Sequence, residues 1–190
     1  MKGVKVSKIE EQSRVVDTLL LAFSNDPLQR YLMPDPSIYF KNSTIWFENA
    51  ASQSISINSL FTIEDCSGVA IWFKPNFEVQ FDALEVTMND LPSDSLKDIS
   101  QYFEEFQKNK PKDAWYLEYL GVDPSKHSLG IGSSLLKQTL EKIDQLHQPA
   151  YLESSNPRNL TLYKRHGFEV VTKLQFGNGP LINTMYREAR

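Results

Sequence analysis

The chain contains the stretch Gly121-Val-Asp-Pro-Ser-Lys-His-Ser-Leu-Gly-Ile-Gly-Ser-Ser-Leu-Leu136, which runs from a predicted strand through a loop into a predicted helix. Gly130 and Gly132 stand where that helix begins, and because they lack Cβ atoms a ligand can approach their backbone closely. The first N–H groups of a helix have no partner inside it, and the helix dipole adds partial positive charge at the same end. The stretch therefore indicates either an anion site, helped by the Ser133 hydroxyl and the Lys126 charge, or a plain helix start after a glycine turn.

Three phosphate-binding motifs compete for this stretch. A P-loop does not fit, because no lysine follows Gly132. The dinucleotide fingerprint needs a third glycine where this chain has Leu135, and it expects several alternating strands and helices upstream. A loop that binds the phosphates of an acyl-coenzyme A fits the placement of both glycines between strand and helix.

Hydrophobic periodicity on either side of the stretch predicts further strands and helices. The predicted strands are 1–6, 59–63, 68–73, 115–122, 150–154, 168–176 and 181–186, of which 59–63 and 68–73 form an antiparallel hairpin. The predicted helices are 7–25, 37–56, one or two around 94–107, 130–147 and 157–166, with Asp26-Pro27 ending the first. This order predicts an α/β sandwich with a mixed sheet.

The composition limits the class of protein. The chain has 190 residues, of which 41% are hydrophobic, and these values predict a single domain over 1–190. A net charge of −4 argues against a general nucleic-acid binder. The single cysteine, Cys66, excludes an internal disulfide and a multi-cysteine metal site. Residues 1–10 have no apolar signal segment, and no window reaches the length of a membrane span, so we expect a cytoplasmic protein without a membrane partner.

Two motifs in this order resemble those of the GNAT acetyltransferase superfamily. The loop of that family usually reads Gln/Arg-x-x-Gly-x-Gly/Ala after a strand that ends in Val, and here His127-Ser-Leu-Gly-Ile-Gly132 follows Val122. The second signature is an Asn, then a Tyr seven residues on, then Gly-Phe. Here these residues are Asn156, Tyr163 and Gly167-Phe168. Two motifs at a suitable separation are much more specific than either motif alone.

Longer segments, at 68–75, 111–124 and 149–168, look similar to the puromycin N-acetyltransferase branch of that superfamily. The resemblance covers most of the chain but is dense only from about 111 to 170. It implies a mixed, mostly antiparallel, splayed sheet flanked by helices, and acetyl-CoA as cosubstrate. Three positions depart from the usual pattern, namely His127, Ser128 and Leu129. Because much phosphate binding uses backbone N–H groups, these departures weaken the expected affinity more than the assignment.

The resemblance also implies which residues bind the donor. The backbone of Leu120 and Val122 is expected to pair with the pantetheine arm, as an added strand would, and an N–H near Leu120 is expected to stabilise the oxyanion. Asn156 and Asn159 either cap the small helix or touch the donor. The complete predicted set is Leu120, Gly121, Val122, His127, Ser128, Leu129, Gly130, Ile131, Gly132, Ser133, Asn156, Asn159 and Tyr163.

Three side chains are candidates for the chemistry, which the resemblance implies is direct attack of a neutral amine on the acetyl thioester. Tyr163 holds the position where the superfamily commonly has its acid, and a phenol can protonate a leaving thiolate. The alternative is a tyrosine that only packs on the small helix. Glu153 and Glu118 lie in apolar strand segments, where desolvation raises a carboxyl pKa, so each is a candidate base. The alternative for each is an exposed strand carboxylate or a substrate anchor.

The N-terminal half is expected to form the acceptor side. Its candidate aromatic residues, which core packing also explains, are Trp46, Phe47, Trp72, Phe73 and Phe77. Its candidate acidic residues for attracting a cationic amine are Asp26, Asp35 and Glu48. The branch resemblance suggests a small-molecule amine acceptor and no metal. A protein or peptide acceptor, a non-catalytic acyl-CoA-binding module and a homodimer remain open alternatives.

Overall fold

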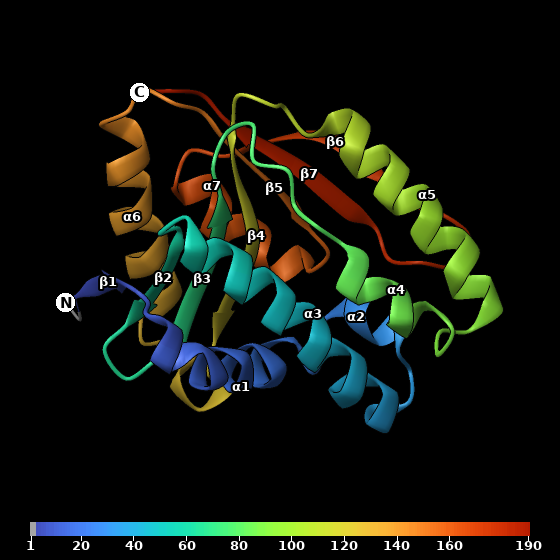
Figure 1. Ribbon diagram of the computed structural model, residues 1–190. Coiled ribbons are helices and arrows are strands. Elements are labelled where there is room, and N and C mark those ends of the chain that lie inside the picture. Colours follow the sequence, from blue (N-terminus) through green and yellow to red (C-terminus); the bar gives the residue numbers. More distant parts are fainter. Residues whose placement is uncertain (1–2) are drawn as a thin grey trace.

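The structure, a computed structural model, describes residues 3–190. The strands of this part of the chain form one sheet in the order β1-β2-β3-β4-β5-β7-β6 (Figure 1). They are β1 (Val4–Val6), β2 (Leu60–Ile63), β3 (Gly68–Phe73), β4 (Trp115–Val122), β5 (Ala150–Ser154), β6 (Glu169–Leu174) and β7 (Ile182–Arg187). The helices are α1 (Gln12–Phe23), α2 (Pro27–Leu32), α3 (Pro36–Ser56), α4 (Asp82–Met88), α5 (Ser93–Asn109), α6 (Ile131–Asp144) and α7 (Leu160–Arg165), with short 3-10 helices at Ile9–Glu11, Pro124–Lys126 and Pro157–Asn159.

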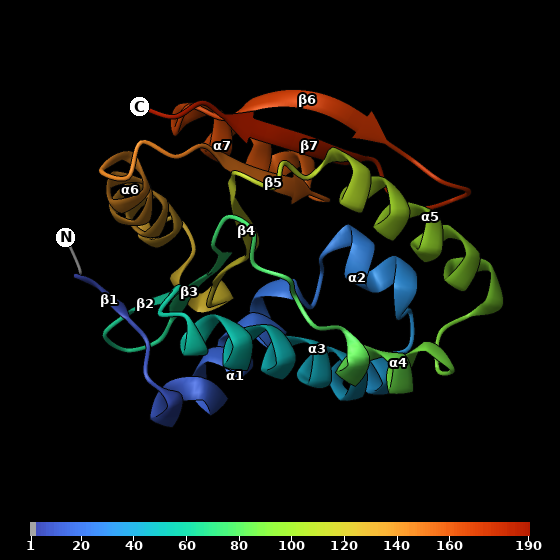
Figure 2. The same cartoon turned by 45° about the horizontal axis from the view of Figure 1, so that its top comes forward.

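The sheet is mixed, because β4 and β5 run parallel while the other neighbouring strands run antiparallel. Helices cover both of its faces (Figure 2). α6 packs Leu135 and Leu136 against Trp72 on one face, and α1 and α3 pack Leu19 and Phe47 on the other. The α/β fold with a mostly antiparallel sheet flanked by helices is thereby confirmed. The single domain over 1–190 stays a prediction.

The pairing of β4 with β5 is short. Their register covers Trp115–Leu117 against Ala150–Leu152, while β4 continues to Val122. On its other edge β4 contains a bulge, since Leu117 faces Trp72 of β3 and Tyr119 faces the adjacent Ile71. Glu118 is the extra residue of this bulge, and such bulges bend a strand and redirect its side chains. The two strands therefore part at Glu118.

Several predicted element boundaries were wrong near the N-terminus. The first helix was expected at 7–25, but a 3-10 turn precedes α1, which begins at Gln12. Asp26-Pro27 was expected only to end that helix, yet it starts α2. The Asp26 carboxylate accepts hydrogen bonds from the N–H groups of Leu28 and Gln29, and proline suits the first helical position. The strand expected at 1–6 spans Val4–Val6, and positions 1 and 2 lie outside the described residues.

Other expectations held closely. The strands at 115–122 and 150–154 match β4 and β5, and the hairpin of β2 and β3 is antiparallel. The region around 94–107 contains α5, and α4 precedes it. None of the helices in residues 3–190 is long and apolar enough to cross a membrane.

β4 lies close to α1 at Gly121, one of the residues expected to contact the donor. A Cβ atom at this position would lie 2.9 Å from Leu19 Cδ2 and 3.1 Å from Ala22 Cβ. The side of Gly121 that faces α1 therefore serves helix–sheet packing, and a larger residue must push the helix away from the sheet.

We expect Gly121→Ala to lower the free energy of unfolding by about 1–3 kcal/mol, the usual cost of overpacking a filled core. Urea denaturation followed by circular dichroism measures this change. Gly3→Ala is the control, because no atom would lie within 4 Å of its Cβ. Equal stability of the two variants would contradict the packing role of Gly121.

Candidate active site

The loop between β4 and α6 presents unpaired backbone donors. Gly130 caps α6 with φ 76°, and the first helical hydrogen bond runs from Ser134 N–H to the Gly130 carbonyl. The N–H groups of Ile131, Gly132 and Ser133 therefore have no acceptor inside the helix. They point from the positive end of its dipole, which is the arrangement that binds a phosphate.

Ser128, where the family pattern usually has glycine, has φ 63°. This is the left-handed region, which glycine enters without steric cost. The left-handed conformation at this position accounts for the glycine that the family pattern usually has there. This chain adopts the same conformation with a serine.

Side chains of the loop are largely engaged with the protein. His127 Nε2 lies 3.1 Å from the Val122 carbonyl oxygen, and Lys126 Nζ lies 2.8 Å from Asp65 Oδ2. Leu129 is 71% exposed. The loop therefore offers backbone groups to an anion, while the Lys126 charge expected there is paired with Asp65.

β4, α6 and α7 converge at Gly132. A Cβ at Gly132 would lie 3.6 Å from Val122 and 3.8 Å from Leu162 of α7, which is ordinary contact. Ser133 Oγ lies 2.9 Å from Nε2 of His166, at the end of α7. The structure thus brings the two sequence motifs together beside the edge of β4 that is no longer paired with β5 after Leu117.

The second motif supplies one cap and one buried phenol. Asn156 accepts a hydrogen bond of 3.1 Å from the Arg158 N–H, so its side chain caps the 3-10 turn, whereas Asn159 forms no side-chain cap in the described chain. Tyr163 is 6% exposed and meets Phe168 edge to face, with ring centres 6.1 Å apart. The capping alternative therefore fits Asn156.

Glu118 and Glu153 follow directly after the last paired residues of the parallel strands, Leu117 and Leu152. Both carboxylates line one cavity of about 120 Å³, the inner cavity, together with Asp26. Both Glu153 oxygens are buried without a hydrogen bond of normal geometry to any described residue. The strand parting thus places two candidate bases side by side at a sheltered point.

Burial is the main influence on both carboxyl groups. The pKa of Glu153 is raised to about 7: burial is the largest cause and the nearby Glu118 charge adds to it, while the hydroxyls of Tyr116 and Tyr151 and the charge of Lys110 oppose the shift. Burial also raises the pKa of Glu118, again opposed by Lys110. A carboxyl group with a pKa near neutrality can exchange a proton with an amine under physiological conditions.

The proton on Tyr163 is also held firmly. Burial raises the pKa of the Tyr163 phenol, and the Asp26 charge adds to the effect. Asp26 itself has a raised pKa because it is buried, although hydrogen bonds from Ser155 Oγ and two backbone N–H groups partly offset this. The phenol is therefore protonated at neutral pH, as a proton donor must be.

Aromatic side chains enclose the inner cavity. They include Trp46, Phe81, Phe103, Phe106, Tyr116 and Tyr119. Trp46 and Asp26 were expected on this side, whereas Phe47 and Trp72 are core residues and Asp35 and Glu48 lie exposed. The α5 aromatics were missed, although Phe103 and Phe106 stand three residues apart on one helix face.

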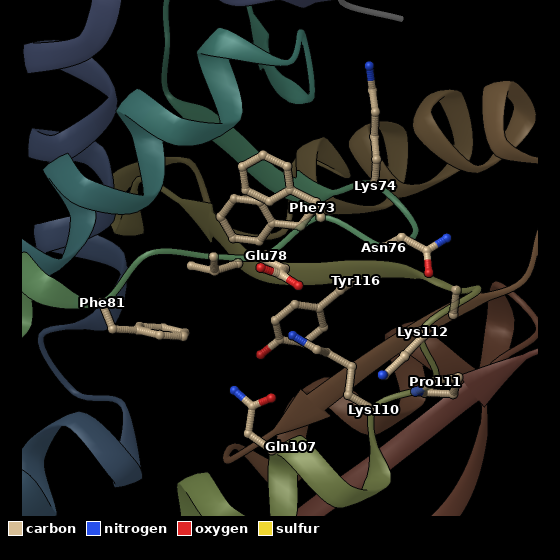
Figure 3. Close-up of a pocket in the computed structure, with 13 residues that line it drawn as sticks. Phe73, Lys74, Asn76, Glu78, Phe81, Gln107, Lys110, Pro111, Lys112 and Tyr116 are labelled. Carbon is tan, nitrogen blue, oxygen red and sulfur yellow. The ribbon is translucent and has the colours of Figure 1, made fainter.

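A second cavity, the outer cavity, adjoins the first at the start of β4 and has a volume of about 470 Å³. Phe73 and Phe77 stack in its wall at a ring-centre distance of 5.3 Å. Figure 3 shows that Tyr116 of β4 and Lys110 at the end of α5 project into it. The loop between β4 and α6 lies at the opposite end of β4 from the outer cavity. No cluster of metal-ligating side chains occurs within residues 3–190.

Comparison with known proteins identifies the fold family. A family model described as an acetyltransferase (GNAT) domain matches residues 99–170. This part of the chain, which includes β4, α6, β5 and α7, is similar to a GNAT acetyltransferase domain. An uncharacterized N-acetyltransferase of Schizosaccharomyces pombe is 25% identical over 185 residues, covering 87% of this chain and 74% of the relative. The superfamily and the N-acetyltransferase class expected from the sequence are thus confirmed, and the puromycin branch stays a prediction.

Solved structures agree with the GNAT fold. A Corynebacterium glutamicum protein described as histone acetyltransferase HPA2 and related acetyltransferase has a TM-score of 0.71 at 22% identity, covering 100% of this chain and 98% of its own. The Drosophila melanogaster polyamine N-acetyltransferase also reaches 0.71, at 12% identity and 99% and 100% coverage. Arylalkylamine N-acetyltransferase 2 of Aedes aegypti reaches 0.69, at 12% identity and 99% coverage of both chains.

The raised pKa of Glu153 predicts a pH-dependent loss of stability. Its folded-state pKa of about 7 exceeds the ordinary value of 4.5, so the folded protein holds this proton more tightly than the unfolded chain does. Stability should therefore fall as pH rises from about 4.5 to about 7. We expect Glu153→Gln to be roughly 1–3 kcal/mol more stable than the wild type at about pH 8, and equally stable at about pH 4.5.

Thermal and urea unfolding at several pH values test this difference. Glu169→Gln, on the exposed side of β6, is the control and should leave the pH dependence unchanged. A stability difference between Glu153→Gln and the wild type that does not vary with pH would contradict the raised pKa.

Proposed function

We propose that this GNAT domain transfers an acetyl group from acetyl-CoA to the primary amine of a small molecule, by direct attack of the amine. The observation that carries the proposal is the carboxylate pair Glu118 and Glu153, sheltered among aromatic side chains where β4 and β5 part. Such a site can take a proton from an ammonium group while excluding bulk water.

Residues at the C-terminal end of β4 would hold the donor, which supplies the acetyl thioester. The N–H groups of Ile131, Gly132 and Ser133 would bind its phosphates. The free edge of β4 around Leu120 and Val122 would pair with the pantetheine arm, as an added strand pairs with a sheet. Holding both substrates on one strand removes much of the entropic barrier to their reaction.

Glu153 would act as the base, and Glu118 would assist it. An acceptor amine arrives mainly as an ammonium ion and attacks only after it loses a proton. Glu153 has a pKa of about 7, so it is substantially ionised at neutral pH and can accept that proton. Glu118 adds negative charge next to it, which attracts the cation to the inner cavity.

Tyr163 would act as the general acid. Its protonated hydroxyl would give a proton to the leaving thiolate sulfur as the new amide forms. Burial raises the pKa of the phenol, and it also destabilises a thiolate in the same surroundings. Burial therefore does not make the proton transfer from the phenol to the thiolate unfavourable. Tyr163 thus has both the burial and the protonation state that the role requires.

The enclosed inner cavity favours a small acceptor over a peptide, which would need a long open groove. Relatives with the same fold include proteins named for arylalkylamines and polyamines, and both are small amines. A panel of arylalkylamines, polyamines, puromycin and short peptides, assayed by thiol release from acetyl-CoA, tests the proposal. Turnover of peptides alone would overturn it, and so would no turnover together with tight acetyl-CoA binding.

Tyr163→Phe should lower kcat about tenfold or more, because the leaving group loses its proton donor. The KM for acetyl-CoA should change little, since the phenyl ring keeps its packing against Phe168. Thiol release under saturating acceptor measures the effect. Tyr186→Phe on β7, outside the inner cavity, should retain full activity. A fully active Tyr163→Phe enzyme would exclude Tyr163 as the acid.

The pH dependence of kcat/KM should identify the base. In the wild type, kcat/KM should rise with pH and level off above about pH 7, because ionised Glu153 then deprotonates the bound ammonium. In Glu153→Gln, kcat/KM should be lower at neutral pH and keep rising to higher pH, since only acceptor that is already neutral can react. Identical profiles of the two enzymes would assign the base elsewhere.

A further inference from the structure

The charge of the cavity walls changes along β4. The outer cavity is lined by three lysines and one carboxylate, which are Lys74, Lys110, Lys112 and Glu78. The inner cavity is lined by three carboxylates and, in the described chain, by no lysine or arginine; the carboxylates are Asp26, Glu118 and Glu153. One end of the acceptor side is therefore basic and the other acidic.

A narrow cavity lies between these two and shares walls with both. Lys110 and Tyr116 belong to this passage and to the outer cavity. Glu118 and Glu153 belong to the passage and to the inner cavity. A molecule that extends through the passage thus has one end beside the carboxylates and the other beside the lysines, with Phe81 in the wall along its whole length.

Two of the three lysines have the geometry to bind a ligand. In Figure 3 the side chains of Lys110 and Lys112 point into the outer cavity, whereas Lys74 extends away from it. Lys110 Nζ lies 4.8 Å from the ring centre of Tyr116, at the mouth of the passage. Within residues 3–190 neither Lys110 nor Lys112 forms an ion pair. Glu78 is the single carboxylate among the described residues that line the outer cavity, so lysines still outnumber carboxylates in its wall.

We propose that the acceptor is an amine with an anionic group at its far end, such as a carboxylate, which Lys112 and Lys110 bind in the outer cavity. This inference rests on the proposed function and specifies its substrate class. The amine would reach Glu153, an apolar or aromatic middle section would pass Phe81, and the acid group would form charge-assisted hydrogen bonds with the lysine ammonium groups. A second cation at that end, as in a polyamine, would be repelled by the same lysines.

Matched acceptors that differ only at the far end test this class. An aromatic set consists of para-(aminomethyl)benzoate, benzylamine and para-xylylenediamine, and a longer aliphatic set of ε-aminocaproate, hexylamine and hexamethylenediamine. In at least one set we expect kcat/KM to fall from the anionic to the neutral to the cationic acceptor, by about fivefold at each step and mainly through KM.

Lys112→Glu should reverse this order, so that kcat/KM for the cationic acceptor exceeds kcat/KM for the anionic one. Lys108→Glu is the matched control, because Lys108 is an exposed α5 lysine that pairs with Glu104 and Glu105 and does not line the outer cavity. This variant should keep the wild-type order.

The outcomes separate this inference from the proposed function. Turnover with no preference for the anionic member of either set would overturn the inference and leave the small-amine function standing. If no acceptor turns over, calorimetry with para-(aminomethyl)benzoate and benzylamine decides. A preference for the anionic ligand that Lys112→Glu abolishes would support the anion site although the proposed function fails, and the absence of any preference would overturn both.

Discussion

The parting of β4 from β5 after three parallel residue pairs is the constraint on which the rest of the molecule depends. A strand edge that has lost its neighbour keeps N–H and C=O groups that need partners. Here that edge faces a helix start with unpaired N–H groups at Ile131–Ser133, so a ligand with an extended amide arm and phosphates at one end satisfies both. The same parting places Glu118 and Glu153 in the inner cavity, so one feature of the backbone would serve both substrates of the proposed reaction.

Burying two carboxylates side by side is unfavourable, and the structure shows how the chain accommodates it. Desolvation raises the pKa of each carboxyl group, and the Lys110 charge offsets part of the cost of burying both negative charges. A fully paired site would be more stable, but it would hold Glu153 permanently ionised, with a pKa too low for efficient proton exchange near neutral pH. The incomplete pairing of Glu153 is thus the physical basis of its suitability as a base.

The sequence predicted those parts of the site that are encoded locally. β4, β5 and the glycine-containing helix start follow from short patterns, and so does the position of Tyr163 after Asn156. The bulge at Glu118 was not predictable, because it exists only in register with β3. The role of the α5 aromatic residues was not predictable either. Periodicity places Phe103 and Phe106 on one helix face, but it does not show that this face lines the inner cavity. Asp26 was expected to end the first helix and to be an acceptor-side acid, and only the tertiary structure shows that it caps α2 and lines the inner cavity.

The order of charge along β4 would give the two proposed substrates opposite orientations. At the C-terminal end of the strand, backbone donors at the start of α6 suit anionic phosphates, and at its N-terminal end Lys110 and Lys112 suit an anionic acceptor group. The carboxylates lie between these ends, where their negative charge repels anionic groups and attracts the ammonium form of the amine. Each substrate would therefore be anchored by its remote charged end, while its reactive end is directed to the middle of β4. Binding energy from groups that do not react would then position the groups that do, which is how remote contacts contribute to rate.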